Sequence, residues 1–152
     1  MEIQFHLEWL KHGQVSSKVF KLAAARFLFL EYVERISKFV PCRVSGALLR
    51  GEQRRMGTRI WVCDRAQGAK SLSSEALAAT LESLRDSGTH KLEILIGGAD
   101  GFSKGELEEL KPDLRWSFGP LTFPHELAAV IASEQIYRAW TIIRGLPYHS
   151  GH

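Results

Sequence analysis

The sequence predicts an α/β fold, in which a mostly parallel sheet carries helices on both of its faces. Short apolar segments of strand length alternate along the chain with longer segments whose apolar residues recur every three or four positions. Strands that alternate with helices favour parallel pairing, with the helices packed on the sheet. A chain of 152 residues, 45% of them hydrophobic, is long enough for about one domain with a substantial core. We therefore expect a single domain over residues 1–152.

The N-terminal part of the chain changes from a strand pattern to a helix pattern. Apolar residues alternate within 1–10, which predicts a first strand, and a turn should follow at 12–14. Three- and four-residue spacing then predicts a long amphipathic helix over 16–40, starting at one of its two leading serines. Pro41 should end this helix, because the residue before a proline disfavours helical backbone.

Two strands flank a basic loop in the next part of the chain. The segments 42–49 and 58–64 are apolar enough to predict strands. The loop between them, 50–57, could contact phosphate, but a solvated loop is the simpler interpretation of its arginines (Arg50, Arg54 and Arg55). A second polar loop should cover 64–72.

Capping signals define the first two helices of the second half. Ser73 or Ser74 can cap a helix that Gly88 ends. The S-x-x-E capping box of Ser103 and Glu106 opens a short helix, which stops before a proline.

Two more strands and a long helix complete the chain. The segments 92–96 and 114–118 predict buried strands. The final helix starts at Pro124, a residue that helices tolerate in their first turn, and Gly145 ends it. Residues 146–152 form a tail.

Three loops follow three predicted strands and should meet at one edge of the sheet. They begin at Cys63, Gly97 and Gly119. The carboxyl ends of parallel strands share an edge, and open α/β sheets bind ligands there. Glycine and proline in two of these loops leave backbone groups free to contact a flat heterocycle, although the glycines could equally serve tight turns. The spacing matches neither the dinucleotide fingerprint nor the phosphate loop.

The final helix and the tail carry polar side chains that could do chemistry. Glu134 and Arg138 stand four residues apart, which is also the spacing of a simple intrahelical ion pair. Tyr148 and His149 lie in the tail, where a frayed end is the usual structure. No His/Cys cluster has metal-binding spacing, and no Ser or Cys stands in a recognisable nucleophile motif.

Composition narrows the class of protein. The net charge of +3 permits a polyanionic partner without requiring one. No apolar run is long enough to span a bilayer and the N-terminus does not resemble a signal peptide, so we expect a cytoplasmic protein without a membrane partner. Cys42 and Cys63 lie in apolar segments, which predicts buried thiols.

Two stretches are similar to the C-terminal half of the RlmH family, which comprises bacterial ribosomal-RNA methyltransferases of the SPOUT superfamily. They read ILIGGADGF and WSFGPLTFPHELAAVIASEQIYRAWTIIRGLPYH, and the match is dense from Ser73 to His149. The combination of GG-x-x-G, S-x-x-x-L-T-x-P-H, YRAW and a terminal PYH is very specific. Upstream, EYVERISKF resembles the family's first helix and TRIWVCD its central strand.

The resemblance implies a single SPOUT domain with a deep trefoil knot over about residues 92–149, a fold too rare to expect from composition. It also implies a homodimer that packs the knotted regions together, and S-adenosylmethionine as the methyl donor, without a metal. The methyl acceptor would be N3 of pseudouridine 1915 in the 23S rRNA of the assembled ribosome.

The family's site residues correspond to two groups of positions in this chain. The cofactor pocket would comprise Cys63 (a leucine in most relatives), Gly98, Gly119, Pro120, Leu121, Thr122, Phe123 and Pro124. The catalytic group would comprise Glu134, Arg138, Tyr148 and His149, with the tail crossing to the partner's pocket. Arg138 would stabilise the anion or hold phosphate, and His149 or Glu134 would take the proton.

The chain also departs from the family pattern. Residues 6–12 replace the usual V-G-K turn, the segment between 42 and 58 is shorter, and the loop 64–72 is longer. Leu146 and Ser150 change the tail. These differences concern docking on the ribosome more than donor binding. They leave two alternatives, a non-catalytic RNA-binding relative and a SPOUT enzyme that acts on another RNA.

Overall fold

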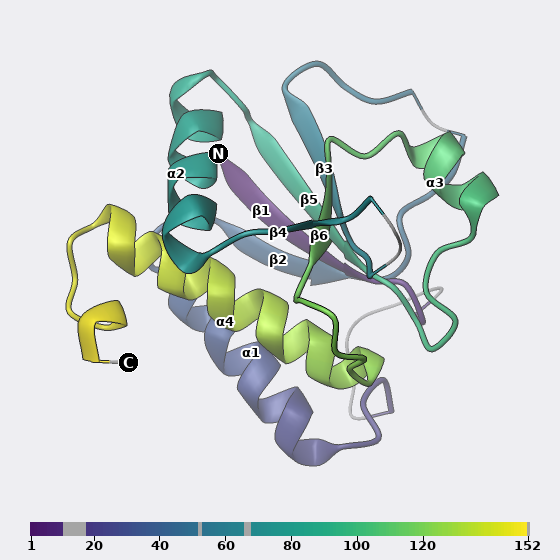
Figure 1. The fold of residues 1–152 in the computed structure, drawn as a ribbon, viewed down its shortest axis with the longest axis horizontal. Helices are drawn as coiled ribbons and strands as arrows, with labels where there is room; N and C mark the ends of the chain where they lie inside the picture. Colours follow the sequence, from purple (N-terminus) through teal and green to yellow (C-terminus); the bar gives the residue numbers. More distant parts are fainter. Residues whose placement is uncertain (11–17, 52, 66–67, 152) are drawn as a thin grey trace.

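Six strands form one parallel sheet in the part of the chain that the computed structural model describes, residues 1–10, 18–51, 53–65 and 68–151 (Figure 1). The strands lie in the order β2-β1-β5-β3-β6-β4, and every pair of neighbours is parallel. Their bounds are β1 Glu2–Leu7, β2 Cys42–Ser45, β3 Thr58–Cys63, β4 Lys70–Ser71, β5 Lys91–Ile96 and β6 Leu114–Ser117. The predicted α/β class is confirmed.

Helices cover both faces of the sheet. On one face α4 lies between α1 and α2, while the short α3 packs on the other face (Figure 1). Their bounds are α1 Ala23–Ser37, α2 Ser74–Asp86, α3 Lys104–Leu110 and α4 His125–Ile143, and a 3-10 turn, η1, covers His149–Gly151. The expectation of helices on both faces is therefore correct.

Alternation along the strands divides the apolar side chains between two cores. On β1, Ile3, Phe5 and Leu7 are fully buried and belong to the larger core beneath α1, α2 and α4. A smaller core on the opposite face joins β3 and β5 to α3 through Ile60, Val62, Leu95 and Leu110. Burying this apolar surface on both faces is the main favourable contribution to folding.

The first helix is shorter at both ends than its apolar spacing predicts. Residues 18–22 are not helical, and α1 covers 23–37 rather than 16–40. The predicted turn at 12–14 and the serines expected to start the helix lie outside the described residues.

Tertiary contacts explain why the segment before α1 is not helical. Phe20 is only 3% exposed, and its ring packs edge-on against Trp9. The N–H of Leu22 donates to a carboxylate oxygen of Glu126 on α4, at 2.9 Å. The apolar ring is buried and the N–H is bonded without a helix, so tertiary structure overrides the local pattern.

The predicted strand over 42–49 is only four residues long as β2. A Cβ at Gly46 would lie 2.2 Å from the carbonyl oxygen of Leu10, so only glycine fits this close approach. The N–H of Ala47 donates to the same oxygen at 2.7 Å, which ends the pairing of β2 with β1.

The sheet order places β6 between β3 and β4, which follow each other in sequence. β4 lies inside the predicted polar loop 64–72, and its two exposed residues show no apolar alternation that could have predicted it. β3 and β4 therefore lie on opposite sides of β6 in the sheet. α4, which follows β6, then packs against α2 and α1 on one face of the sheet.

The predicted helix caps are present. Ser73 caps α2 by accepting the N–H of Ala76 at 3.1 Å, and Gly88 follows the helix with φ +87°. Ser103 and Glu106 make both hydrogen bonds of the capping box at the start of α3. This cap fixes the residue at which the loop after β5 ends.

Candidate active site

A cavity of about 780 Å³ lies at the carboxyl ends of β3, β5 and β6, beside the first turn of α4. Small-molecule sites typically have volumes of roughly 300–1,000 Å³. Cys63 lines the cavity at the end of β3, residues 97–101 line it after β5, and residues 122–124 line it after β6. The three loops therefore meet at one edge of the sheet, as their positions after parallel strands predicted.

Only some of the predicted cofactor-binding residues line this cavity. Cys63, Gly98, Thr122, Phe123 and Pro124 all line it, whereas residues 119–121 do not.

The backbone at Gly119 explains this division. It has φ +98°, a conformation that favours glycine, and the chain turns there. The turn leaves Leu121 67% exposed, outside the cavity.

Each glycine of the loop after β5 has a different reason to lack a side chain. A Cβ at Gly97 would lie 3.0 Å from the ring of Phe102, and Gly101 has φ +68°. At Gly98 neither reason holds, because its φ is not in the left-handed region and a Cβ would meet Trp9 at an ordinary 3.6 Å. The fold does not require glycine at this cavity-lining position, which favours close contact with a ligand.

Aromatic rings and a few charged groups surround the cavity. Trp116 and Phe118 line it and contact each other edge to face, with ring centroids 4.9 Å apart. Asp64, which also lines the cavity, accepts two hydrogen bonds from Arg115, at 2.8 and 3.1 Å. Arg65 donates to the hydroxyl of Thr122 and so joins two of the three loops. Sequence reasoning missed this contact, because a polar loop gives no signal of where its side chains point.

The predicted catalytic residues form one cluster on α4 and the tail. Arg138 donates from Nε and Nη2 to Oε1 of Glu134, at 3.0 and 2.6 Å. The hydroxyl of Tyr148 donates to the same oxygen at 3.0 Å, and the guanidinium lies 5.0 Å from the Tyr148 ring centre. Glu134 and Arg138 therefore belong to a larger network than a simple intrahelical ion pair. The hydrogen bond of Tyr148 also attaches the tail to α4, so the tail is not frayed up to this residue.

His149 joins this cluster to α2. Its Nδ1 lies 3.2 Å from Nη1 of Arg138, and its Nε2 lies 2.8 Å from a carboxylate oxygen of Glu75. A guanidinium can only donate, so Nδ1 accepts and Nε2 carries the proton that Glu75 receives in a hydrogen bond. Glu75 was not expected at the site, since it lies 74 residues away in sequence from His149.

Burial and hydrogen bonds within the cluster determine the protonation states of Tyr148 and Arg138. Burial, together with hydrogen bonds to Tyr32 and Glu134, raises the pKa of Tyr148 far above neutrality. The hydrogen bond to Glu134 raises the pKa of Arg138. At neutral pH, Tyr148 is therefore a hydrogen-bond donor and Arg138 a fixed cation.

The cavity and the cluster of predicted catalytic residues lie at different positions along α4. Ala128 lines the cavity, and Glu134 and Arg138 follow it six and ten residues later. At 1.5 Å per residue, these positions lie about 9 and 15 Å further along the helix axis. Within one chain, the candidate cofactor pocket and the candidate catalytic cluster therefore do not form a single site.

Both cysteines are free, and each residue is partly rather than fully buried. Burial raises the pKa of Cys42 to about 12 and raises that of Cys63 as well. Since the thiolate is the nucleophile, alkylation by iodoacetamide at pH 8 should be roughly a hundredfold slower in native protein than in urea. Mass spectrometry of the labelled cysteines measures both rates, and equal rates would contradict the burial of these thiols.

Two further classes of site are not found in the part of the chain that is described. No group of three or more His, Cys, Asp or Glu side chains there could hold a metal ion. Among the helices of the same residues, none is both long and apolar enough to cross a membrane.

Comparisons with known proteins add to this geometry. The family model for predicted SPOUT methyltransferases matches residues 14–149. A ribosomal RNA large subunit methyltransferase H from Magnetococcus marinus is 38% identical over 82% of this chain and 81% of its own length. Its namesake from Koribacter versatilis is 37% identical over 87% of this chain and 92% of its own length.

Two other matches are less complete. The enzyme of the same name from Maricaulis maris is 44% identical over 61% of this chain, and the match spans only 57% of that relative. A solved structure from Legionella pneumophila, described as a methyltransferase in complex with SAM, aligns over 90% of this chain with 12% identity and a TM-score of 0.45, too low to support an inference. From the family model and the two long matches, the chain belongs to the SPOUT methyltransferases, among the ribosomal RNA large subunit methyltransferases H.

Proposed function

We propose that this chain is an S-adenosylmethionine-dependent methyltransferase that acts on N3 of pseudouridine 1915 in the 23S rRNA of the assembled ribosome. The observation that carries the proposal is the cavity at Gly98, in a chain that belongs to the RlmH family. A binding module would not need a glycine there, since neither φ nor packing requires it.

The residues around the cavity fit S-adenosylmethionine. Its flat adenine suits the bare backbone of Gly98 and the rings of Phe118 and Phe123, and its charged amino-acid end suits the polar rim at Asp64 and Arg65. When bound, the donor supplies a methyl group activated by a sulfonium. The protein's part is to hold the acceptor nitrogen in line with that methyl group.

The cluster on α4 would handle the acceptor. Loss of the N3 proton leaves negative charge on the uracil ring, and the cation of Arg138 stabilises that charge. Glu134 Oε1 already accepts three hydrogen bonds, so its role is to orient Arg138 and Tyr148. His149, whose Nδ1 accepts only one long hydrogen bond in the cluster, is then the better proton acceptor.

A homodimer would bring the two halves of the site together. Within one chain none of the four cluster residues lines the cavity, so the cluster of one subunit would serve the cavity of the other. The packed pair α1 and α4 also exposes apolar side chains that suit a second copy: Leu22 (55% exposed), Phe27 (66%), Leu30 (40%) and Leu127 (40%).

Placing a charge on this apolar face should give a monomer. The double variant Phe27→Glu, Leu30→Glu is expected to sediment as a monomer, to lose methyl transfer and to keep donor binding, since neither side chain lines the cavity. Met56→Glu is the matched control, because Met56 is 99% exposed and lies in the loop before β3 instead of on α1. A wild-type monomer, or a dimer that survives the double substitution, would contradict this interface.

The trefoil knot remains part of the proposal. In sequence, β4 and α2 follow β3 and precede β5. In the sheet, β6 lies between β3 and β4, so this part of the chain has strands on both sides of β6. A chain that leaves β6 and packs as α4 against α2 is consistent with threading through that segment.

Mass spectrometry of 23S rRNA from a deletion strain tests the proposed substrate. We expect N3-methylpseudouridine to disappear from position 1915 and to return when the gene is supplied again. An unchanged level would mean that the enzyme acts on another RNA.

A further inference from the structure

Trp9 follows β1 and packs behind two walls of the cavity. Its ring lies 4.6 Å from that of His125, edge to face, at the start of α4. Its Cβ lies 3.6 Å from where a Cβ would stand on Gly98, in the loop after β5. His125 and Gly98 both line the cavity, whereas Trp9 is not among its described lining residues. Trp9 therefore lies behind both walls, with its Cβ beside the Gly98 loop and its ring against His125.

Trp9 is itself held firmly. Its indole N–H donates to the carbonyl of Val19 at 2.9 Å. On another side the ring packs edge-on against buried Phe20, with centroids 5.8 Å apart. A large aromatic side chain with a bonded N–H has little rotational freedom, so Trp9 can fix the position of whatever it touches.

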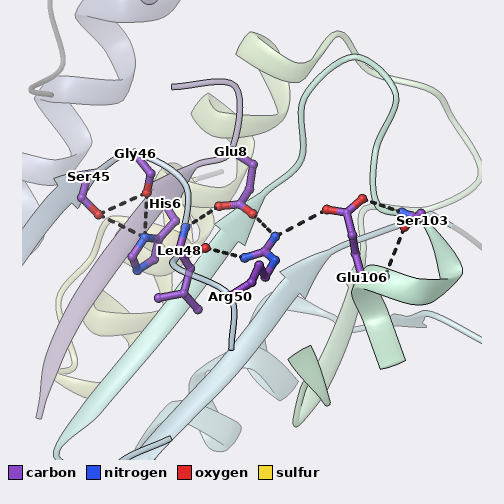
Figure 2. Close-up of polar contacts among 8 residues, drawn as sticks. All are labelled: His6, Glu8, Ser45, Gly46, Leu48, Arg50, Ser103 and Glu106. Carbon is purple, nitrogen blue, oxygen red and sulfur yellow. Dashed lines mark hydrogen bonds and ion pairs between the residues drawn. The ribbon is translucent and has the colours of Figure 1, made fainter. Parts of the chain in front are cut away.

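The neighbouring residue Glu8 ties the same segment to both ends of the glycine loop. Its N–H donates to the carbonyl of Ile96, the last residue of β5, at 3.0 Å. Its carboxylate, 8% exposed, accepts the N–H of Leu48 at 2.8 Å and pairs with Arg50. Arg50 also lies 3.5 Å from Glu106, in the first turn of α3, where the loop ends (Figure 2).

We infer that Trp9 is a positioning residue for the methyl donor, which sets the separation between the Gly98 loop and His125. The inference rests on the proposed function of the cavity. Loss of the indole would leave His125 without its contact to the segment beside the Gly98 loop, so the separation of the two walls would have to be ordered each time the donor binds. Trp9 would act through its two neighbours and not through contact with the donor.

Calorimetric titration with S-adenosylhomocysteine, the demethylated product, tests this role. Trp9→Ala should raise Kd about tenfold or more, and Trp9→Phe, which keeps a ring against His125, should recover most of the affinity. The KM for S-adenosylmethionine should rise with Kd, while kcat at saturating donor stays within about twofold of wild type. If Trp9→Ala does not fold, Trp9→Leu takes its place with the same expectation.

Ile36→Val is the control for lost stability. Ile36 is a fully buried residue near the end of α1 that does not line the cavity, so its substitution should lower Tm and leave Kd unchanged. Wild-type affinity in the Trp9 variant, or an equal loss of affinity in Ile36→Val, would overturn the inference. Absence of binding by the wild-type protein would instead overturn the proposed function.

Discussion

Arg138→Ala is expected to lower methyl transfer by roughly 10²–10³-fold while leaving Kd for S-adenosylhomocysteine within about twofold. The guanidinium is the only group that joins the other three members of the cluster, because it bonds Glu134 and His149 and lies over the ring of Tyr148. It is also the cation available to the anion that forms on the acceptor. Its distance along α4 from the cavity explains why donor binding should persist.

Single-turnover methylation of ribosomes and calorimetry together measure the two quantities. Arg85→Ala is the matched control, because Arg85 forms a helical ion pair with Glu82 (3.5 Å) on α2, without contact to the site. Its rate should equal that of wild type. A loss of donor affinity in Arg138→Ala that matches its loss of rate would place the arginine in the donor pocket instead.

Gly98→Val should abolish donor binding in a folded protein. The backbone at Gly98 does not have positive φ, and a Cβ meets Trp9 at an ordinary 3.6 Å, so the fold tolerates the added Cβ. The branches of valine would occupy space next to the bare backbone that we propose the adenine contacts. We expect Kd for S-adenosylhomocysteine to rise by about a hundredfold or more, with Tm within a few degrees of wild type.

Substitutions at two other glycines distinguish a loss of donor binding from a loss of stability. Gly105→Val, on α3 with open space around its Cβ position, should change neither Kd nor Tm appreciably. Gly97→Ala should lower Tm, because its Cβ would lie 3.0 Å from Phe102. Normal donor binding by Gly98→Val would show that the adenine does not approach this glycine.

The sheet edge and the two groups of site residues could be predicted because local chemistry determines them. Apolar runs and capping residues place the strands and helices, and parallel pairing then brings the loops at Cys63, Gly98 and Phe123 to one edge. The motifs around Glu134 and Arg138 are also local in sequence, so the resemblance to the RlmH family identified them.

The remainder depends on long-range contacts that no local pattern records. Phe20 has helical spacing but is buried from a loop by Trp9. The turn at Gly119 carries Leu121 away from the cavity, and the contact of His149 with Glu75 joins residues 74 positions apart. The role inferred for Trp9 has the same origin, because it arises only where the end of β1 meets α4.

Calorimetric titration of the wild-type protein with S-adenosylmethionine tests the central claim most directly. The account predicts saturable binding of one donor molecule per chain, which Gly98→Val abolishes and Arg138→Ala preserves. Absence of binding at about 1 mM donor would contradict it, because a cavity that serves methyl transfer must bind its donor at least that tightly.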